Sequence, residues 1–247
     1  MRHLDPAGSG PLPGGPVGLS RRTLLAGLLA AWPMAARAQA EGQWHALTGD
    51  DGKPVPNTRL PGELTSEIAG LRGVTWIGPR EAGITLHEFY DYNCPWCRAA
   101  ARDIAALVVA TPDLRVGLVQ NPILSPRSAQ AAKVHLAVQR RAGSAAGYAL
   151  YAKLLGAPGA IDGPRALDAA RSLGHPRDAI EAEADSPEIG AALATQMRLA
   201  ANLGLAATPS YVVGTTGVLG HPGGRALARM VAAVAACDAV TCEGQPG

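Results

Sequence analysis

The sequence predicts an α/β fold that is interrupted by an all-helical insertion. Strand patterns occur on both sides of a long central stretch, and that stretch contains only helical patterns. The composition is that of a folded protein: of the 247 residues, 47% are apolar and 17% are charged, which excludes disorder of the whole chain. Aromatic residues make up only 4%, so we expect a core of Ala, Leu, Val and Ile.

Residues 1–40 have the features of a cleaved export signal. An arginine pair at positions 21–22 precedes an apolar run over residues 23–36, which is shorter than the ~20 residues of a membrane-spanning helix. A small-x-small cleavage box ends at Ala40. The arginine pair resembles a twin-arginine signal, and the alternatives are Sec export or an uncleaved anchor. We expect cleavage after Ala40 and a mature protein outside the cytoplasm.

The mature chain has little net charge. Loss of residues 1–40 removes four basic side chains and one acidic side chain, and changes the formal net charge from +2 to −1. A nucleic-acid partner is therefore not expected. Stable membrane insertion of the mature chain is not expected either, because no later apolar stretch is long enough. Outside the cytoplasm thiols are oxidised, so we interpret cysteine pairs as disulfides or redox dithiols rather than as metal ligands.

An N-terminal wrap and a strand–helix–strand unit come first after the signal. The wrap, residues 41–73, is punctuated by Gly and Pro and has one helical pattern at Gly62–Leu71. Alternating polarity and apolar residues at helical spacing then predict a strand, a strand, a helix and a strand. These elements are Val74–Ile77, Ile84–Tyr90, Pro95–Ala110 and Leu114–Val119. The strands on either side of the helix should be parallel.

Residues 122–203 form the predicted helical insertion. Alanine-rich runs with high helix propensity are separated there by loop residues. Ser186 and Pro187 predict the start of the last helix, and Gly204 predicts its end. The expected helices are Ser128–Arg141, Ala145–Leu155, Pro164–Leu173, Asp178–Ala184 and Pro187–Leu203.

Strand character returns after the insertion. Ser210–Gly214 and Val218–Leu219 predict a hairpin, and Arg225–Cys237 predicts a final amphipathic helix. We therefore expect an α/β domain made of residues 74–121 and 204–237. We expect residues 238–247 to form a C-terminal tail.

The strongest chemical feature is Cys94-Pro95-Trp96-Cys97, where a strand gives way to a helix. Two intervening residues let the sulfurs form a small, easily opened disulfide. The first thiol lies at the helix N-terminus, where free N–H groups and the helix dipole stabilise a thiolate. Such cysteines have pKa values lowered from ~8.5 to ~3.5–7.5, which gives a nucleophile and a good leaving group. Pro95 suits the first helical turn, and Trp96 offers an apolar rim for docking.

Other uses of a C-x-x-C motif fit this context less well. Haem attachment requires His after Cys97, where Arg98 stands. A zinc site needs two more ligands, and Cys237 and Cys242 are the only other thiols. A Cu(I)-binding protein without turnover is a further alternative, because thiolates are soft ligands. We expect no metal and no cofactor.

Cys237 and Cys242 lie at the end of the last predicted helix. We interpret them as a structural disulfide that ties down the C-terminus. The alternatives are free thiols or a secondary redox pair that passes electrons to the first pair. The enclosed loop is short, so such a disulfide would stabilise the fold only modestly.

The sequence HEFYDYNCPWCR at residues 87–98, followed by a helix and by TPSYVVG at residues 208–214, resembles the DsbA-like family of the thioredoxin superfamily. The resemblance covers about residues 74–236. It implies a thioredoxin fold with an inserted all-helical domain, a periplasmic location, and thiol–disulfide exchange with exported, cysteine-containing proteins. It also implies that Cys94 is the exposed nucleophile and Cys97 the buried resolving thiol.

The same resemblance suggests roles for three further residues. Pro209 matches a cis-proline beside the active site, and the backbone of Thr208 would pair with a substrate peptide as an added strand. The alternative is a plain trans turn. Glu88 falls where the family has a buried acid, whose raised pKa would let it exchange a proton with Cys97. The alternative is a solvated or ion-paired strand residue.

The resemblance implies an enzyme, a protein thiol–disulfide oxidoreductase. We expect it to act as a dithiol oxidase that contacts substrates through Pro95, Trp96, Thr208 and Pro209, and to be reoxidised by a membrane redox partner. Disulfide isomerisation or reduction is the alternative. It is suggested by the Pro-Trp dipeptide, which is not the Pro-His of strongly oxidising relatives, and by Thr208.

Overall fold

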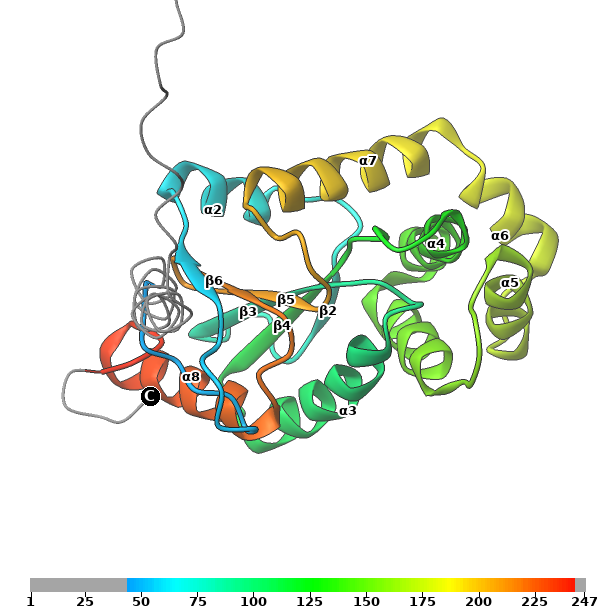
Figure 1. The fold of residues 1–247 in the computed structure, drawn as a ribbon. Helices are drawn as coiled ribbons and strands as arrows, with labels where there is room; N and C mark the ends of the chain where they lie inside the picture. Colours follow the sequence, from blue (N-terminus) through cyan, green and yellow to red (C-terminus); the bar gives the residue numbers. More distant parts are fainter. Residues whose placement is uncertain (1–43, 243–247) are drawn as a thin grey trace, which may run out of the picture. The chain divides into compact units, whose positions relative to one another are not determined.

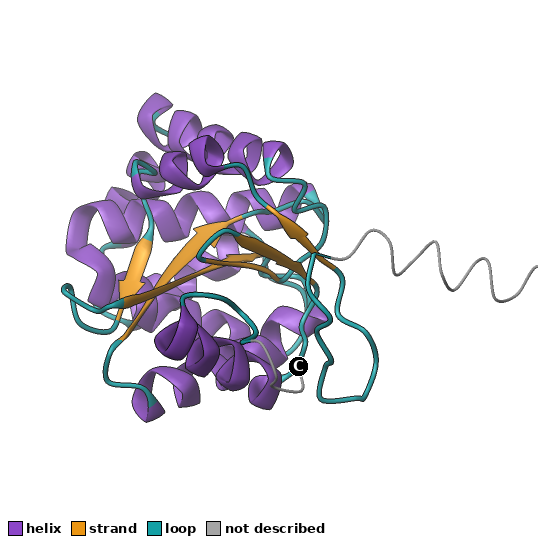
Figure 2. Cartoon of the chain, turned by 90° about the vertical axis from the view of Figure 1, so that its left-hand side faces the viewer, coloured by secondary structure: helices purple, strands orange, loops and turns teal. Residues whose placement is uncertain are grey.

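The structure, a computed structural model, describes residues 44–242, and these form a six-stranded mixed sheet with helices on both faces (Figure 1). Figure 2 shows the sheet as a layer between helices on either side. This arrangement confirms the α/β architecture and the helical insertion that the sequence predicts. The predicted export signal, residues 1–40, and the tail from residue 243 onward lie outside the described residues.

The sheet has the spatial order β1-β6-β5-β3-β4-β2. Among these strands β3 and β4 pair in parallel, and all other neighbours are antiparallel. The crossover through a helix is therefore confirmed. The strands are β1 (Asn57–Arg59), β2 (Thr75–Ile77), β3 (Ile84–Tyr90), β4 (Leu114–Gln120), β5 (Ser210–Val213) and β6 (Thr216–Leu219).

Helices cover the sheet and also form a group at its β2 end (Figure 1). α3 (Pro95–Ala110) and α8 (Gly224–Cys237) lie on one face, and α2 (Gly62–Ala69) and α7 (Pro187–Asn202) lie on the other. The group beside β2 consists of α4 (Pro126–Gly156), α5 (Gly163–Ser172) and α6 (Arg177–Ala184). No helix in residues 44–242 is long and apolar enough to cross a membrane.

The central strand β3 is buried on both faces. Leu86 and Tyr90 pack in the cluster that contains Cys97 of α3, whereas Phe89 packs with Leu199 of α7. Successive residues of a strand point to opposite faces, so one short sequence supplies both cores. The face that carries Glu88 is therefore the α3 face, where the two central cysteines lie.

Helix α4 joins two helices that the sequence predicts separately. Its backbone leaves helical geometry at Gly143, where φ is 82° and ψ is −179°. A positive φ favours glycine, so the predicted break has a physical basis even though the two halves follow each other directly. At the start, the side chain of Ser125 accepts a hydrogen bond from the backbone N–H of Ser128, and Pro126 occupies the first turn.

The wrap contains a strand that the prediction lacked. β1 pairs antiparallel with β6, with Asn57 opposite Val218 and Arg59 opposite Thr216. Its three residues are polar, so they lack the apolar alternation from which strands are predicted. Backbone pairing at the sheet edge, together with hydrogen bonds from the Asn57 side chain to the carbonyls of His45 and Val55, holds the segment in place.

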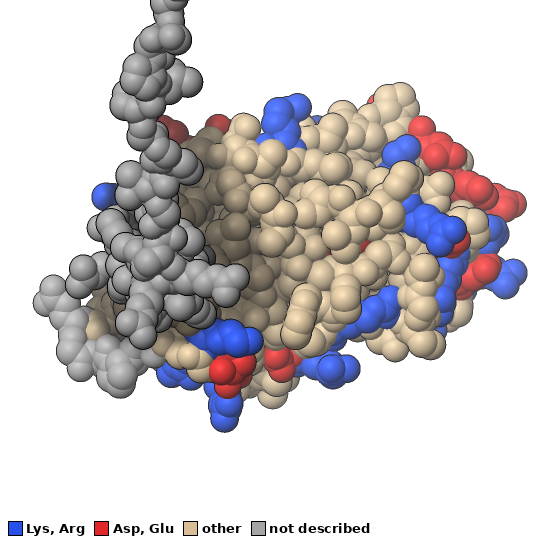
Figure 3. Space-filling model, viewed as in Figure 1, with Lys and Arg blue, Asp and Glu red and all other residues tan. Residues whose placement is uncertain are grey.

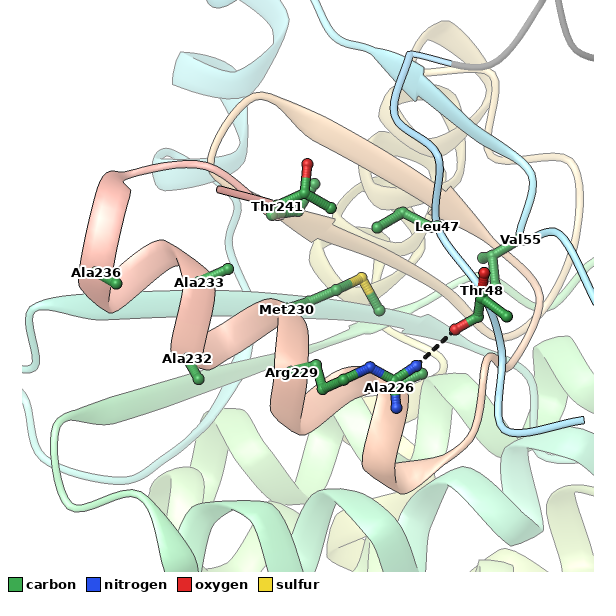
Figure 4. A pocket seen from close by; sticks show the side chains of 11 residues that line it. Leu47, Thr48, Val55, Ala226, Arg229, Met230, Ala232, Ala233, Ala236 and Thr241 are labelled. Atoms are coloured by element: carbon green, nitrogen blue, oxygen red, sulfur yellow. Dashed lines mark hydrogen bonds between the residues drawn. The ribbon is translucent and has the colours of Figure 1, made fainter. Parts of the chain in front are cut away.

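The N-terminal segment and α8 enclose an apolar cavity of about 380 Å³ (Figure 4). Leu47 and Val55 face Met230 and other side chains of α8 across it. Arg229 closes one side by donating to the backbone carbonyl of Thr48 at 2.7 Å. None of the lining residues belongs to the Cys94–Cys97 segment, so this cavity is separate from the site described below.

Candidate active site

The turn between β3 and α3 places Cys94 at the start of the helix. Cys94 is the N-cap residue of α3, and Pro95 follows in the first turn. The backbone N–H of Cys94 donates to the carbonyl of Asp91 at 3.1 Å, and the Asp91 carboxylate accepts the N–H of Asn93 at 2.7 Å. These local bonds close the turn, so the reactive sulfur lies where the unpaired N–H groups of the helix converge.

Cys94 is electronically activated. The Cys97 thiol, the Thr208 hydroxyl and the backbone N–H groups of Cys97 and Trp96 lower its pKa to about 6, against an opposing effect of burial. Each of these groups favours the thiolate over the thiol. Both Cys94 and Cys97 are free thiols in this structure.

Cys94 is not exposed, contrary to the sequence-based expectation. Only 3% of the residue is accessible to solvent. Its sulfur lies 2.9 Å from the carbonyl oxygen of Thr208, to which the thiol donates. The loop before β5, which lies 114 residues further along the chain, thus covers the sulfur, and a local sequence pattern contains no sign of such a contact.

Cys97 is fully buried one helical turn further on. Burial raises its pKa well above the usual range, and the hydrogen bond to Cys94 and the charge of Glu88 act in the same direction. The two thiols of the motif therefore differ strongly in acidity. At neutral pH the proton stays on Cys97 and leaves Cys94.

Glu88 is a buried acid with one hydrogen bond. It is 0% exposed, and its Oε2 atom accepts the hydroxyl of Tyr151 at 2.7 Å. Its Oε1 atom has no hydrogen-bond partner among the described residues. Burial raises the pKa of Glu88 to about 8, the Tyr151 hydroxyl opposes this rise, and a charge on Cys94 adds to it. The carboxyl is neither solvated nor ion-paired in residues 44–242.

The peptide bond between Thr208 and Pro209 is cis. The loop also contains the buried Thr208 hydroxyl, which lowers the pKa of Cys94. At the other end of the loop, the hydroxyl of Ser210 donates to the carbonyl of Ala207 at 2.7 Å. The loop thus lies directly against the Cys94 sulfur.

Exposed apolar side chains lie near the thiols. Trp96 is 65% exposed, and Ile123 and Leu124 are 43% and 52% exposed. The loop with Leu124 is joined to the active-site turn, because its N–H donates to the Asp91 carboxylate at 2.9 Å. Figure 3 shows a broad expanse of uncharged residues on one side of the molecule, with charged side chains at its margins.

A groove of about 690 Å³ opens beside the motif. Asn93, Pro95 and Arg98 line one side, and Pro126 and Arg127 at the start of α4 line the other. Arg98 donates to the backbone carbonyl of Leu155 in the last turn of α4 and to those of Ala157 and Gly159 in the loop that follows. The helical insertion therefore forms one wall of the groove and is fixed to the helix that carries the thiols.

A second set of buried polar groups lies behind Glu88 and was not predicted. His135 of α4 contacts the hydroxyl of Tyr92 at 2.6 Å and that of Thr75 at 2.7 Å. Burial lowers the pKa of His135 to about 3, so it is neutral. Tyr90 donates to Tyr92 at 3.2 Å. Tyrosines are rare in this aromatic-poor sequence, and their grouping at positions 90 and 92 is the one sequence feature that could have pointed to this set.

The C-terminal cysteines form a disulfide between Cys237 and Cys242. Cys237 is the last residue of α8, and Asp238 caps the helix in a left-handed conformation. The described residues contain no cluster of three or more His, Cys, Asp or Glu side chains placed to hold a metal ion.

Comparison with known proteins gives one family. The model of the DSBA-like thioredoxin domain matches residues 85–233. A thioredoxin-like oxidoreductase from Silicibacter pomeroyi DSS-3 is 33% identical, with a TM-score of 0.59, and the match covers 63% of this chain and 88% of that chain. No curated protein matches the sequence.

Two further solved structures are similar. The catalytic domain of Proteus mirabilis ScsC is 26% identical, with a TM-score of 0.59, and the match covers 66% of this chain and 92% of that chain. The thiol-disulfide exchange protein alpha-DsbA2 from Wolbachia pipientis is 22% identical, with a TM-score of 0.64, over 70% of this chain and 92% of that chain. At this identity the second similarity concerns the fold alone.

Proposed function

Because the chain belongs to the DSBA-like thioredoxin domain family and is a thiol–disulfide oxidoreductase, we propose that it is a dithiol oxidase of exported proteins in the periplasm. Its fold is the thioredoxin fold with a helical insertion that the resemblance implied. Cys94 is the sulfur that substrates attack, Cys97 is the resolving thiol, and Glu88 is the proton carrier of Cys97.

The observation that carries the oxidase direction is the difference in acidity between the two thiols. A pKa of about 6 makes Cys94 mostly thiolate at neutral pH. The Cys94 thiolate exists only in the reduced protein, so the groups that stabilise it stabilise the reduced form and not the disulfide form. Stabilising the reduced form raises the reduction potential, so the disulfide form of the enzyme tends to accept electrons from substrate thiols.

The reaction proceeds in two exchanges. A substrate thiolate attacks the Cys94 sulfur of the oxidised enzyme, the Cys94–Cys97 bond breaks, and Cys97 leaves and takes a proton from Glu88. A second substrate thiolate then attacks the substrate sulfur of the mixed disulfide, and Cys94 leaves as a stable thiolate. The substrate gains a disulfide and the enzyme gains two electrons, which a membrane redox partner removes.

Substrate binding involves the loop and rim around the thiols. The backbone of Thr208 lies against Cys94, where an extended peptide would bond to it as an added strand. The exposed Trp96 ring supplies apolar contact area, and Pro95 and Pro209 directly follow Cys94 and Thr208 in the sequence. The contacts to the substrate are therefore mostly backbone and apolar ones, which suits an enzyme that meets many exported cysteine-containing chains.

The reduction potential of the Cys94–Cys97 pair tests the direction. A value near ~−120 mV is typical of strong oxidants and one near ~−270 mV of reductants. We expect a value on the oxidising side, together with faster refolding of a reduced substrate than repair of a scrambled one. Cys97→Ala should trap the mixed disulfide at Cys94. A strongly negative potential with efficient repair of scrambled substrates would instead establish the isomerase or reductase alternative.

Export through the twin-arginine route is part of the proposal. It is supported by the arginine pair at positions 21–22 ahead of a short apolar run. Replacing both arginines by lysine should retain the chain in the cytoplasm, and sequencing the exported protein should give an N-terminus just after Ala40. Undiminished export of the lysine variant would show that the Sec route is used.

A further inference from the structure

The helical insertion donates one hydrogen bond to the redox centre. Tyr151 belongs to α4, is fully buried, and places its hydroxyl oxygen 2.7 Å from Oε2 of Glu88. Because Oε1 of Glu88 has no partner, this is the one hydrogen bond that the carboxyl receives in residues 44–242. The two residues are 63 positions apart in the sequence, and the contact joins the insertion to the α/β domain.

Glu88 has no basic partner in residues 44–242, and the buried His135 contacts the hydroxyls of Tyr90 and Tyr92 instead. No lysine, arginine or histidine forms a hydrogen bond or ion pair with Glu88 in the described part of the chain. The neighbouring strand β4 presents Leu118 opposite it. The titratable groups that act on it or feel its charge are Tyr90 and Tyr92 at the end of β3, Cys94 and Cys97 at α3, Tyr151 on α4 and Tyr211 on β5.

We propose that Tyr151 is a positioning residue for the exchange reaction, which holds the Glu88 carboxylate where it exchanges a proton with Cys97. The inference rests on the proposed function, because it assumes that Glu88 serves the Cys97 proton. A neutral phenol that donates to a buried carboxylate stabilises the charged form without forming an ion pair. Proton uptake by Glu88 thus depends on a residue of the insertion.

The step that depends on Tyr151 is closure of the mixed disulfide. The Cys97 thiol gives its proton to the Glu88 carboxylate, and the resulting thiolate attacks the Cys94 sulfur. The Cys94–Cys97 bond forms as the bond to the partner sulfur breaks, and the partner leaves as a thiolate with the electron pair. In the opposite direction protonated Glu88 returns the proton to Cys97.

The ring of Tyr151 is fixed by its surroundings. Tyr90 packs against it edge-to-face, with ring centroids 4.9 Å apart, and Tyr148 stacks at 6.1 Å one turn earlier on α4. The packed ring therefore holds the hydroxyl oxygen within hydrogen-bond distance of Glu88. Packing of the insertion and protonation of the redox centre are linked through this side chain.

The test compares Tyr151→Phe with Tyr148→Phe in the full-length protein. Both changes remove one hydroxyl from the same helix, but Tyr148 makes no hydrogen bond to Glu88. Tyr151→Phe should raise the Glu88 pKa by ~1 unit, which reduces the fraction of carboxylate at pH 7 about tenfold. The pKa is followed by the carboxyl infrared band, and mixed-disulfide closure by single-turnover kinetics with a small disulfide across the pH range.

We expect Tyr151→Phe to move the pH profile of closure toward higher pH and Tyr148→Phe to leave it in place. In a Glu88→Gln background, Tyr151→Phe should have no further effect on that profile. Unchanged profiles in a folded Tyr151→Phe protein, or an equal effect in the Glu88→Gln background, would overturn the inference.

A second variant covers the case in which Tyr151→Phe folds poorly. Difluorotyrosine at position 151 keeps the shape of the ring and is a stronger donor, so it should lower the Glu88 pKa. A Glu88 pKa that stays the same or rises with this side chain would contradict the inference. An inactive wild-type protein would refute the proposed function instead, and the infrared titration of Glu88 would still decide the role of Tyr151.

Discussion

The two cysteine pairs lie at opposite ends of helices, and this difference separates a reactive pair from an inert one. Cys94 caps the N-terminus of α3, whereas Cys237 ends α8. N–H groups and the Cys97 thiol point toward Cys94 and lower its pKa. Cys237 instead lies in the last turn of α8, where its sulfur is 3.2 Å from the carbonyl oxygen of Ala233 and no helix N–H groups point toward it. A helix C-terminus disfavours a thiolate, so Cys237 is a poor nucleophile and a poor leaving group in thiol–disulfide exchange.

The surroundings of the pairs differ in a second way. Near Cys94 there are a buried acid, an apolar rim and an open groove. Near Cys242 the chain forms a short turn whose residues Val240 and Thr241 line the cavity beneath α8. The first pair therefore has a proton carrier and space for a substrate beside it. The second pair links the end of α8 to the C-terminal turn. We propose that the second disulfide is structural.

The largest expected effect is loss of turnover at the first pair alone. Cys94→Ser removes the attacked sulfur and should reduce thiol–disulfide exchange to the uncatalysed rate, because no other described thiol has a lowered pKa. Cys242→Ser should change the rate by less than about twofold. Oxidation of a reduced model substrate measures both. A large loss on Cys242→Ser would mean that the second pair relays electrons.

The next largest effect concerns acidity. Alkylation of the reduced protein should rise through a midpoint near pH 6, since the Cys94 pKa is lowered to about 6, and Cys97 should stay unmodified. Because the folded pKa lies below that of an unfolded cysteine, the stabilisation of the reduced protein is present above the unfolded value and is lost as pH falls through about 6. A midpoint near the ordinary ~8.5 would remove the contrast between the pairs.

A moderate effect on stability is expected at the second pair. The loop between Cys237 and Cys242 spans a sequence separation of 5, and the chain-entropy relation assigns to so short a loop about 2 kcal/mol. Cys237→Ala combined with Cys242→Ala should therefore lower the melting temperature by several degrees, while the Cys94 alkylation profile stays unchanged. An unaltered melting temperature would show that this disulfide does not stabilise the fold.

The local part of the active site was predictable, because it depends on residues that are close in sequence. The strand, the turn and the helix start follow from the pattern between residues 84 and 110, and the burial of Cys97 was implied by the family resemblance. The parallel pairing of β3 and β4 follows equally, since a crossover through a helix is the usual connection between parallel strands.

The distant contacts do not follow from local patterns. The position of Thr208 beside Cys94, across 114 residues, was implied by the family resemblance, whereas the contact of Tyr151 with Glu88, across 63 residues, was implied by neither pattern nor resemblance. Nothing near Tyr151 in an alanine-rich helix marks its hydroxyl as a partner of a buried acid. Strand β1 was missed for a related reason, because its backbone pairs at the sheet edge while its polar side chains give no alternation.

The smallest predicted effect concerns one hydroxyl beside the first pair. The Thr208 side chain contributes to the lowered pKa of Cys94. Thr208→Val keeps the shape of the side chain and removes the hydroxyl, so the Cys94 pKa should rise by less than about one unit.

The alkylation midpoint of Thr208→Val measures this rise, and Ser210→Ala in the same loop is the control, since the Ser210 hydroxyl donates to the Ala207 carbonyl and not to the sulfur. A midpoint that moves equally in both variants would assign the effect to the loop backbone. A shift confined to Thr208→Val would show that the low pKa of Cys94 depends partly on a residue far along the chain. Cys237, at the end of α8, has no such neighbour among its hydrogen-bond partners in the described part of the chain.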